Sequence, residues 1–220
     1  MIMKLRLFFL TSLLIYSCTD SDSETISIFN FLPSNSKVII NINDLNNTKE
    51  ILSNNKLLPI VLKTSKEISD QISLFSNKNS DRKGLFSLST FGKNEIAFTY
   101  IRKSNSFDTI KENDILKNQY QKSEIFVEEA NGEEILKVII DEYIVSSNKD
   151  IILENIIRDY NSAKNYDDSE FNKIIKTTDS SEPFNIFTKS NNLSKLDYIS
   201  NDLSFFPEST TSWVGYDFNY

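Results

Sequence analysis

A hairpin centred on Asn131-Gly132 restricts the possible folds more than any other segment. The pair lies in the stretch EIFVEEANGEEILKVII, between two runs that are rich in apolar residues. Both residues accept a positive φ, which the two-residue turn of a tight hairpin requires. A third apolar run, EYIVSS, begins directly after Asp141. The sequence therefore predicts three consecutive strands in the middle of the chain.

Period-two alternation of apolar residues predicts further strands on both sides of this hairpin. Val38, Ile40 and Ile42 alternate with their neighbours, after a turn at Pro33 and the Ser/Asn residues that follow it. Alternation of this kind places one face of a strand in the core. The same pattern predicts a second hairpin over 84–103, with FGKN as its turn, and single strands in PFNIFTK and SWVGYDFNY.

Helical periodicity predicts helices between these runs of strands. Apolar residues recur at helical spacing over 57–75 and over 148–160. Shorter helices are expected after a capping box at Asn47, after a cap at Ser169, and over 191–200. The polar stretch 103–121 is expected to be a loop with a helical turn or two. Runs of antiparallel strands with helices between the runs indicate an α+β fold rather than a doubly wound sheet.

Composition excludes several classes of function. The 220-residue chain carries a formal charge of −7, which disfavours nucleic acid as a partner because phosphates are repelled. It contains no histidine, so Ser-His-Asp and Cys-His catalysis are excluded within the chain. With one cysteine, neither an internal disulfide nor a cysteine-rich metal site can form.

The amino terminus has the order of a secretory signal. Lys4 and Arg6 precede the apolar segment LFFLTSLLIY, which is shorter than the roughly 20 residues that a membrane span needs. Ser17 and Cys18 follow, and then the acidic run TDSDSE. A buried free cysteine in an N-terminal helix is the alternative interpretation of Cys18.

The segment IYSC, from Ile15 to Cys18, resembles the lipobox of bacterial lipoproteins. In that family the signal peptide is cut before the cysteine, whose thiol then carries a diacylglyceryl group. Tyr16 departs from the pattern, because the family usually has a smaller residue at this position. The resemblance implies that Cys18 is the lipid attachment site, and two or three acyl chains anchor a protein stably.

The acidic run after Cys18 is similar to the tether of surface-exported lipoproteins in Bacteroidota-type bacteria. It implies an outer-membrane protein that faces either the cell surface or the periplasm, and both orientations remain open. The expected organisation is a signal peptide over 1–17, a lipidated acidic tether over 18–30 and an α+β domain over 31–220.

The stretch LPSNSKV, from Leu32 to Val38, resembles the opening L-P-x-x-[ST]-x-V of uncharacterised strand-helix domains in bacterial envelope proteins. The phrase YIVSSNKDIILENIIRD resembles a later part of the same domains. This resemblance brings no catalytic residues. In similar proteins the chain often continues beyond such a domain, so one hypothesis is that this chain is the N-terminal part of a longer protein.

No set of residues forms a recognisable catalytic, cofactor-binding or metal-binding motif. Glu128-Glu129 and Glu133-Glu134 flank the hairpin turn, where solvated charges are expected more than an acid-base pair. Asp141-Glu142 and Asp167-Asp168 lie in predicted turns, and no EF-hand pattern is present. The aromatic residues of the final strand are expected to be core and cross-strand residues, with stacking on a sugar or a partner as the alternative: Trp213, Tyr216, Phe218 and Tyr220.

These observations predict a lipid-anchored envelope protein that is a non-catalytic binding or assembly module. Its expected partners are the membrane, through Cys18, and an envelope protein or a glycan. No cofactor is expected. Two alternatives stay open, namely an N-terminal structural module of a larger surface protein and a carboxylate-dependent glycan hydrolase.

Overall fold

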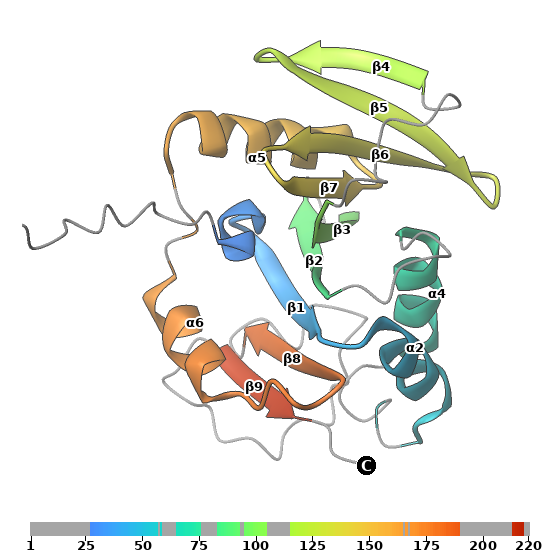
Figure 1. Ribbon diagram of the computed structural model, residues 1–220, viewed down its shortest axis with the longest axis vertical. Coiled ribbons are helices and arrows are strands. Elements are labelled where there is room, and N and C mark those ends of the chain that lie inside the picture. Colours follow the sequence, from blue (N-terminus) through green and yellow to red (C-terminus); the bar gives the residue numbers. More distant parts are fainter. Residues whose placement is uncertain are drawn as a thin grey trace, which may run out of the picture.

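The computed structural model describes residues 27–56, 58, 65–75, 83–92, 95–104, 115–164, 166, 168–189 and 213–217. The strands of this part of the chain form one nine-stranded sheet in the order β4-β5-β6-β7-β3-β2-β1-β8-β9 (Figure 1). Every neighbouring pair is antiparallel. The strands are β1 (Ser36–Ile42), β2 (Gly84–Phe91), β3 (Glu95–Lys103), β4 (Ile115–Tyr120), β5 (Ser123–Ala130), β6 (Glu133–Ile140), β7 (Tyr143–Ser147), β8 (Phe184–Lys189) and β9 (Trp213–Asp217).

Helices cover both faces of the sheet. On one face α2 and α4 pack against each other, and on the other face α5 lies along β6 and β7 while α6 lies against β9 (Figure 1). A short 3-10 helix, η1, enters β1 on the same face as α5. The helices are η1 (Ile28–Phe31), α2 (Leu45–Asn54), α4 (Ser65–Phe75), α5 (Asp150–Asn161), α6 (Ser169–Ile174) and η2 (Ile175–Thr177). The predicted α+β class is confirmed.

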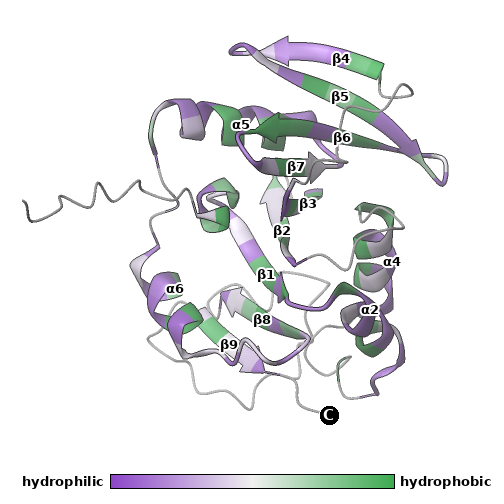
Figure 2. Cartoon of the chain, viewed as in Figure 1, coloured by the Kyte–Doolittle hydropathy of each residue, from purple (hydrophilic) through white to green (hydrophobic). Residues whose placement is uncertain are grey.

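The alternation of β1 sends its side chains into two separate cores. Ile40 packs with the residues of α2 and α4, whereas Ile39 packs with those of α5 and α6. Both side chains are fully buried. Burial of an isoleucine stabilises a fold by about 1.5–3 kcal/mol, so the central strands hold both helical layers in place. The colours of Figure 2 show the same apolar character along β6, β7 and the inner side of α5.

The hairpin at Asn131-Gly132 forms as predicted. Ala130 of β5 pairs with Glu133 of β6 across a two-residue turn. The φ angles of the turn residues are 54° for Asn131 and 82° for Gly132. Both lie in the left-handed region that asparagine and glycine tolerate best.

The prediction of a loop with a helical turn over 103–121 is wrong for residues 115–120, which form β4. This strand pairs with β5 through a turn of Gln121 and Lys122, whose φ angles are 46° and 73°. Neither residue is typical of such a turn, so the usual hairpin signal is missing. Ile115 and Leu116 are exposed by 70% and 53%, so β4 also lacks the alternation of a half-buried strand.

Two helix caps lie elsewhere than predicted. Helix α2 begins after Asp44, whose carboxylate accepts a hydrogen bond from the backbone N–H of Asn47. Helix α6 begins after Asp168, which accepts from the N–H of Phe171, so Ser169 is the first helical residue and not the cap. Aspartate is a strong N-cap because its charge also complements the helix dipole.

Several predictions fall outside the described residues. They include Cys18 and the whole segment 1–26, most of 57–64 in the predicted helix over 57–75, and the predicted helix over 191–200. Within the part of the chain that the structure describes, no helix is long and apolar enough to cross a membrane.

Candidate functional site

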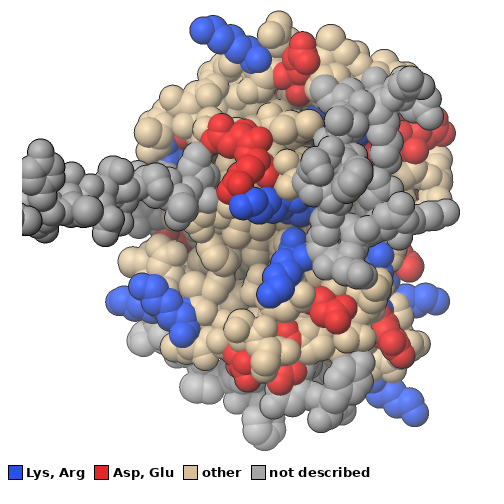
Figure 3. Space-filling view, in the orientation of Figure 1, with Lys and Arg blue, Asp and Glu red and all other residues tan. Residues whose placement is uncertain are grey.

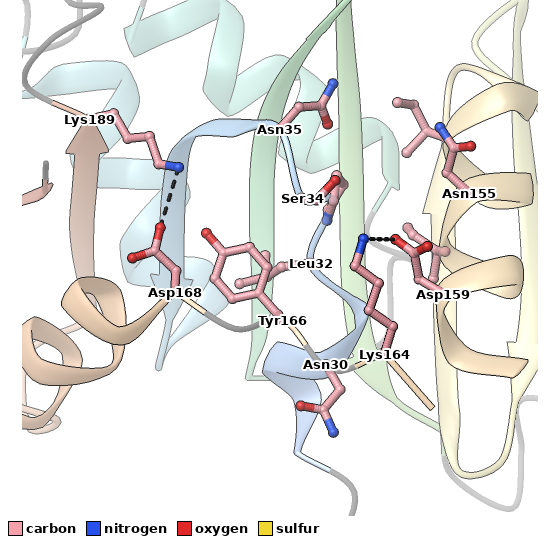
Figure 4. Close-up of a pocket in the computed structure, with 13 residues that line it drawn as sticks. Asn30, Leu32, Ser34, Asn35, Asn155, Asp159, Lys164, Tyr166, Asp168 and Lys189 are labelled. Carbon is pink, nitrogen blue, oxygen red and sulfur yellow. Dashed lines mark ion pairs between the residues drawn. The ribbon is translucent and has the colours of Figure 1, made fainter. Parts of the chain in front are cut away.

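A cavity of about 590 Å³ lies between the entry to β1 and helix α5. Four parts of the chain contribute to its wall: Asn30 with residues 32–35, one side of α5, the residues Lys164, Tyr166 and Asp168 after α5, and Lys189 at the end of β8 (Figure 4). The volume falls in the range of about 300–1,000 Å³ that is typical of small-molecule sites. The turn around Leu32 and helix α5 are thus neighbours here.

A turn at Pro33 places residues 32–35 at the cavity. Ser36 donates two hydrogen bonds to the carbonyl oxygen of Pro33, at 3.0 Å from its backbone nitrogen and 2.7 Å from its hydroxyl. This closes the chain into a turn before β1 starts. Leu32 and Pro33 are consequently buried, whereas Ser34 and Asn35 are exposed at the rim.

Helix α5 lines the cavity with a stripe of four residues. Ile152, Asn155, Ile156 and Asp159 follow the i, i+3, i+4, i+7 spacing that lies on one side of a helix. The two isoleucines are buried, and the asparagine and aspartate are partly exposed. The helix therefore presents an apolar base and a polar edge to the cavity.

Two lysine–aspartate pairs stand on opposite sides of the cavity (Figure 4). Lys189 Nζ lies 3.3 Å from Asp168 Oδ2, with both side chains about one fifth exposed. Lys164 Nζ lies 4.0 Å from Asp159 Oδ2, and this lysine is mostly exposed. The four charges of the lining therefore balance.

Asp168 is the most strongly bonded of these groups. The indole Nε1 of Trp213 donates to its Oδ2 at 2.7 Å, and the N–H of Phe171 donates to its Oδ1 at 3.1 Å. Lys189 also lies over the ring of Trp213, 4.9 Å from its centre. Burial alone would raise the pKa of Asp168, but the bonds from Trp213, Phe171 and Lys189 together lower this pKa below its ordinary value.

The ring of Tyr166 lies between the two pairs in the view of Figure 4. It makes an edge contact with Phe171, with ring centres 5.6 Å apart and planes at 88°. Its hydroxyl is buried and has no hydrogen-bond partner in the structure as described. Burial, together with the nearby carboxylate of Asp168, raises the pKa of Tyr166 far above its ordinary value, so the phenol stays protonated at neutral pH.

The carboxylates at the hairpin tip lie away from this cavity. Glu129 and Glu134 face each other across β5 and β6 and are exposed. Glu128 pairs with Lys137 at 3.5 Å. None of these glutamates lines the cavity. They are at the hairpin turn as expected, and the structure does not bring them together with a second functional group.

The acidic residues of the two predicted turns have different surroundings. Asp141 accepts a hydrogen bond from the hydroxyl of Tyr160, and Glu142 pairs with Lys103 at 2.7 Å. Asp168 lines the cavity, whereas Asp167 lies outside the described residues. Among the residues described, no group of three or more acidic or cysteine side chains is placed to hold a metal ion.

The aromatic residues of β9 follow the core interpretation as far as they are described. Trp213 is 3% exposed and packs with Phe171 in the core beneath α5 and α6. Tyr216 packs against the core on the opposite face of the sheet. Phe218 and Tyr220, like Cys18, lie outside the described residues.

The sequence did not indicate five polar residues of the lining: Asn155, Asp159, Lys164, Tyr166 and Lys189. Only α5 offers a signal, because Asn155 and Asp159 are four residues apart beside the predicted apolar stripe.

Searches for matching protein families, curated proteins and solved structures found no match to this chain.

Proposed function

We propose that this chain is a lipid-anchored protein of the bacterial outer membrane, and that its domain is a non-catalytic binding module. In this proposal Cys18 carries the lipid and the cavity beside α5 is the binding site. The observation that supports the binding role is that both carboxylates of the cavity are paired with lysines, while the pKa of Asp168 is lowered and that of Tyr166 is raised, each away from neutral pH.

General acid-base catalysis needs a group whose pKa lies near the working pH. In the cavity the pKa of Asp168 is lowered and that of Tyr166 is raised, so neither group exchanges protons readily near neutrality. Ser34 lies in the lining, but the chain has no histidine to activate a serine. These properties favour ligand binding over catalysis as the function of the cavity.

A glycan hydrolase is the competing function, because Asp159 and Asp168 both line the cavity. In such enzymes the carboxylic acid that protonates the leaving group has a raised pKa. Here Asp168 has a lowered pKa, and each carboxylate is paired with a lysine. We therefore expect no products when the protein is incubated with polysaccharides and the mixture is analysed by mass spectrometry.

The position of the cavity relative to Cys18 supports a role near the membrane. Asn30, the first lining residue, follows Cys18 by only twelve residues. A chain segment of this length reaches about 43 Å at most when fully extended. A lipid at Cys18 would therefore keep the cavity close to the membrane surface.

The anchoring is tested by the intact mass of the protein purified from membranes, beside a Cys18→Ser variant. We expect a mature chain that begins at Cys18 and is heavier by the mass of its acyl groups, and an unprocessed variant. An unmodified Cys18 in the native protein would refute the anchor, and it would leave the binding role of the cavity to be judged by ligand titration.

A further inference from the structure

The charged side chains of the cavity sum to no net charge, so they do not favour an ionic ligand. Lys164 and Lys189 are balanced by Asp159 and Asp168. An ionic ligand would compete with these pairs for their partners, and the overall charge of −7 repels anions at long range. Figure 3 shows acidic and basic side chains next to one another on the face seen there, rather than a patch of one sign. A neutral ligand leaves the pairs intact.

The cavity nevertheless offers many hydrogen bonds. The side-chain amides of Asn30 and Asn155 belong to the lining, and each amide can both donate and accept hydrogen bonds. The paired lysines retain N–H donors, and the paired carboxylates retain lone pairs. Ligand hydroxyl groups also both donate and accept, so they match this mixture of groups.

An apolar surface lies beside these polar groups. Leu32, Pro33, Ile152 and Ile156 are buried at the base of the cavity, and the ring of Tyr166 adds an aromatic surface. A ligand that fits must combine hydroxyl groups with an apolar face. A sugar ring has this construction, because its C–H bonds form faces and its hydroxyl groups project from its edge.

The hydroxyl of Tyr166 is an unpaired buried polar group on a residue of the cavity lining. It is buried without a partner, and an unpaired buried hydroxyl destabilises a protein. The raised pKa keeps it a hydrogen-bond donor. An occupant reaches this hydroxyl only when the wall around Tyr166 shifts on binding, and an oxygen atom of the occupant then supplies the acceptor that the described chain does not provide.

We infer that the cavity binds a neutral glycan unit of one or two sugar rings, an inference that rests on the proposed binding function. The two Lys–Asp pairs and the asparagine amides hold the hydroxyl groups, and the aliphatic base takes the face of the ring.

Trp213 provides a local probe for the test. It is the only tryptophan of the chain, and its indole donates to the cavity residue Asp168. The full-length protein in detergent is titrated with neutral sugars: glucose, galactose, mannose, N-acetylglucosamine and their disaccharides. At least one sugar should change the fluorescence of Trp213 saturably. Its affinity should vary little between low and high salt, because an uncharged ligand adds no screened ion pair.

Two pairs of variants assign the binding to the cavity. Asn155→Leu should weaken the affinity about tenfold and Tyr166→Phe about threefold, since each removes hydrogen-bonding groups. Their controls, Asn172→Leu and Tyr120→Phe, lie outside the lining and should bind as the native protein does. Far-UV circular dichroism checks folding. If Asn155→Leu does not fold, the comparison of Tyr166→Phe with Tyr120→Phe decides.

The remaining outcomes overturn the inference in distinguishable ways. If glutamate or N-acetylneuraminate binds with a strong salt dependence and the neutral sugars do not bind, the ligand class is wrong but the module still binds ligands. If a neutral sugar binds equally well to both cavity variants, the site is wrong. If no probe binds, or if a sugar is cleaved, the proposed function fails as well.

Discussion

Asp168 joins three elements through one carboxylate. It caps α6 and also accepts hydrogen bonds from Trp213 of β9 and Lys189 of β8. We expect Asp168→Ala to lower the free energy of unfolding by about 2–3 kcal/mol, since a cap and charged hydrogen bonds are lost together. Urea unfolding followed by far-UV circular dichroism measures this effect without relying on Trp213.

The matched control is Asp44→Ala. Asp44 caps α2, and among the contacts described its carboxylate bonds only to Asn47. Its loss should cost about 1 kcal/mol, as for an ordinary N-cap. Equal losses in the two variants would show that the bonds to Trp213 and Lys189 add nothing to stability.

The lowered pKa of Asp168 also predicts a dependence of stability on pH. In the folded protein this carboxyl binds fewer protons than in the unfolded chain, whose aspartate pKa is about 3.9. Its contribution is therefore present above that pH and is lost as the pH falls through the folded pKa. The difference in unfolding free energy between the native protein and Asp168→Asn should be largest near neutrality and shrink in acid. A difference that stays constant down to acidic pH would contradict this assignment.

At the scale of elements, the two outer hairpins have the same turn geometry and different residues. Lys122 and Gly132 both occupy the second turn position, with φ angles of 73° and 82°. At a positive φ the Cβ of a lysine crowds the backbone and strains it, whereas glycine has no Cβ. We expect Lys122→Gly to stabilise the protein by about 1 kcal/mol and Gly132→Lys to destabilise it by a similar amount.

Both changes are measured by urea unfolding. No atom outside the turn lies within 4 Å of a Cβ built at Gly132, so crowding does not confound that substitution. A loss of stability in Lys122→Gly would mean that the aliphatic part of Lys122 contributes more than its backbone strain costs.

The same hairpins show which elements the sequence predicts well. Asn131-Gly132 gave a local turn signal, and β5 and β6 formed as expected. Strand β4 had neither that signal nor a buried face, because it is held by backbone pairing to β5 at the edge of the sheet. The helices begin elsewhere than predicted because Asp44 and Asp168, rather than Asn47 and Ser169, accept the hydrogen bond of the first turn, where a carboxylate also complements the helix dipole. The sequence pattern predicted that α2 and α6 form, but the polar residue that acts as N-cap determines where each helix begins.

At the scale of the whole molecule, the cavity could not be read from the sequence. Its lining comes from the turn at Pro33, from α5, from Lys164, Tyr166 and Asp168, and from Lys189. Asp168 is predicted to lie in a turn but is the extended residue that caps α6, and its contacts with Lys189 and Trp213 depend on how β8 and β9 lie beside α6. These contacts depend on pairing between strands that are far apart in the sequence, and no local sequence pattern predicts that pairing.

The last prediction concerns the distance between the domain and the membrane. Ser27, the first described residue, follows Cys18 by nine positions, and such a segment spans about 32 Å at most. In vesicles that carry a dansyl headgroup lipid, Trp213 of the lipidated protein should therefore transfer energy to the acceptor. Inserting about twenty Gly/Ser residues after Asp20 should reduce the transfer, because the mean reach of such a linker grows with the square root of its length.

A chain that begins at Thr19 retains all the described residues and lacks the attachment site, so it should show no transfer. If it transfers energy as well as the lipidated protein does, the surface of the domain itself binds the membrane. If the insertion leaves the transfer unchanged, the domain rests on the bilayer and the tether does not set the distance. Reduced transfer with the insertion and none without Cys18 would together require both a lipid at Cys18 and a domain held only by its tether. The single tryptophan makes these cases separable, because the whole signal arises beside the cavity.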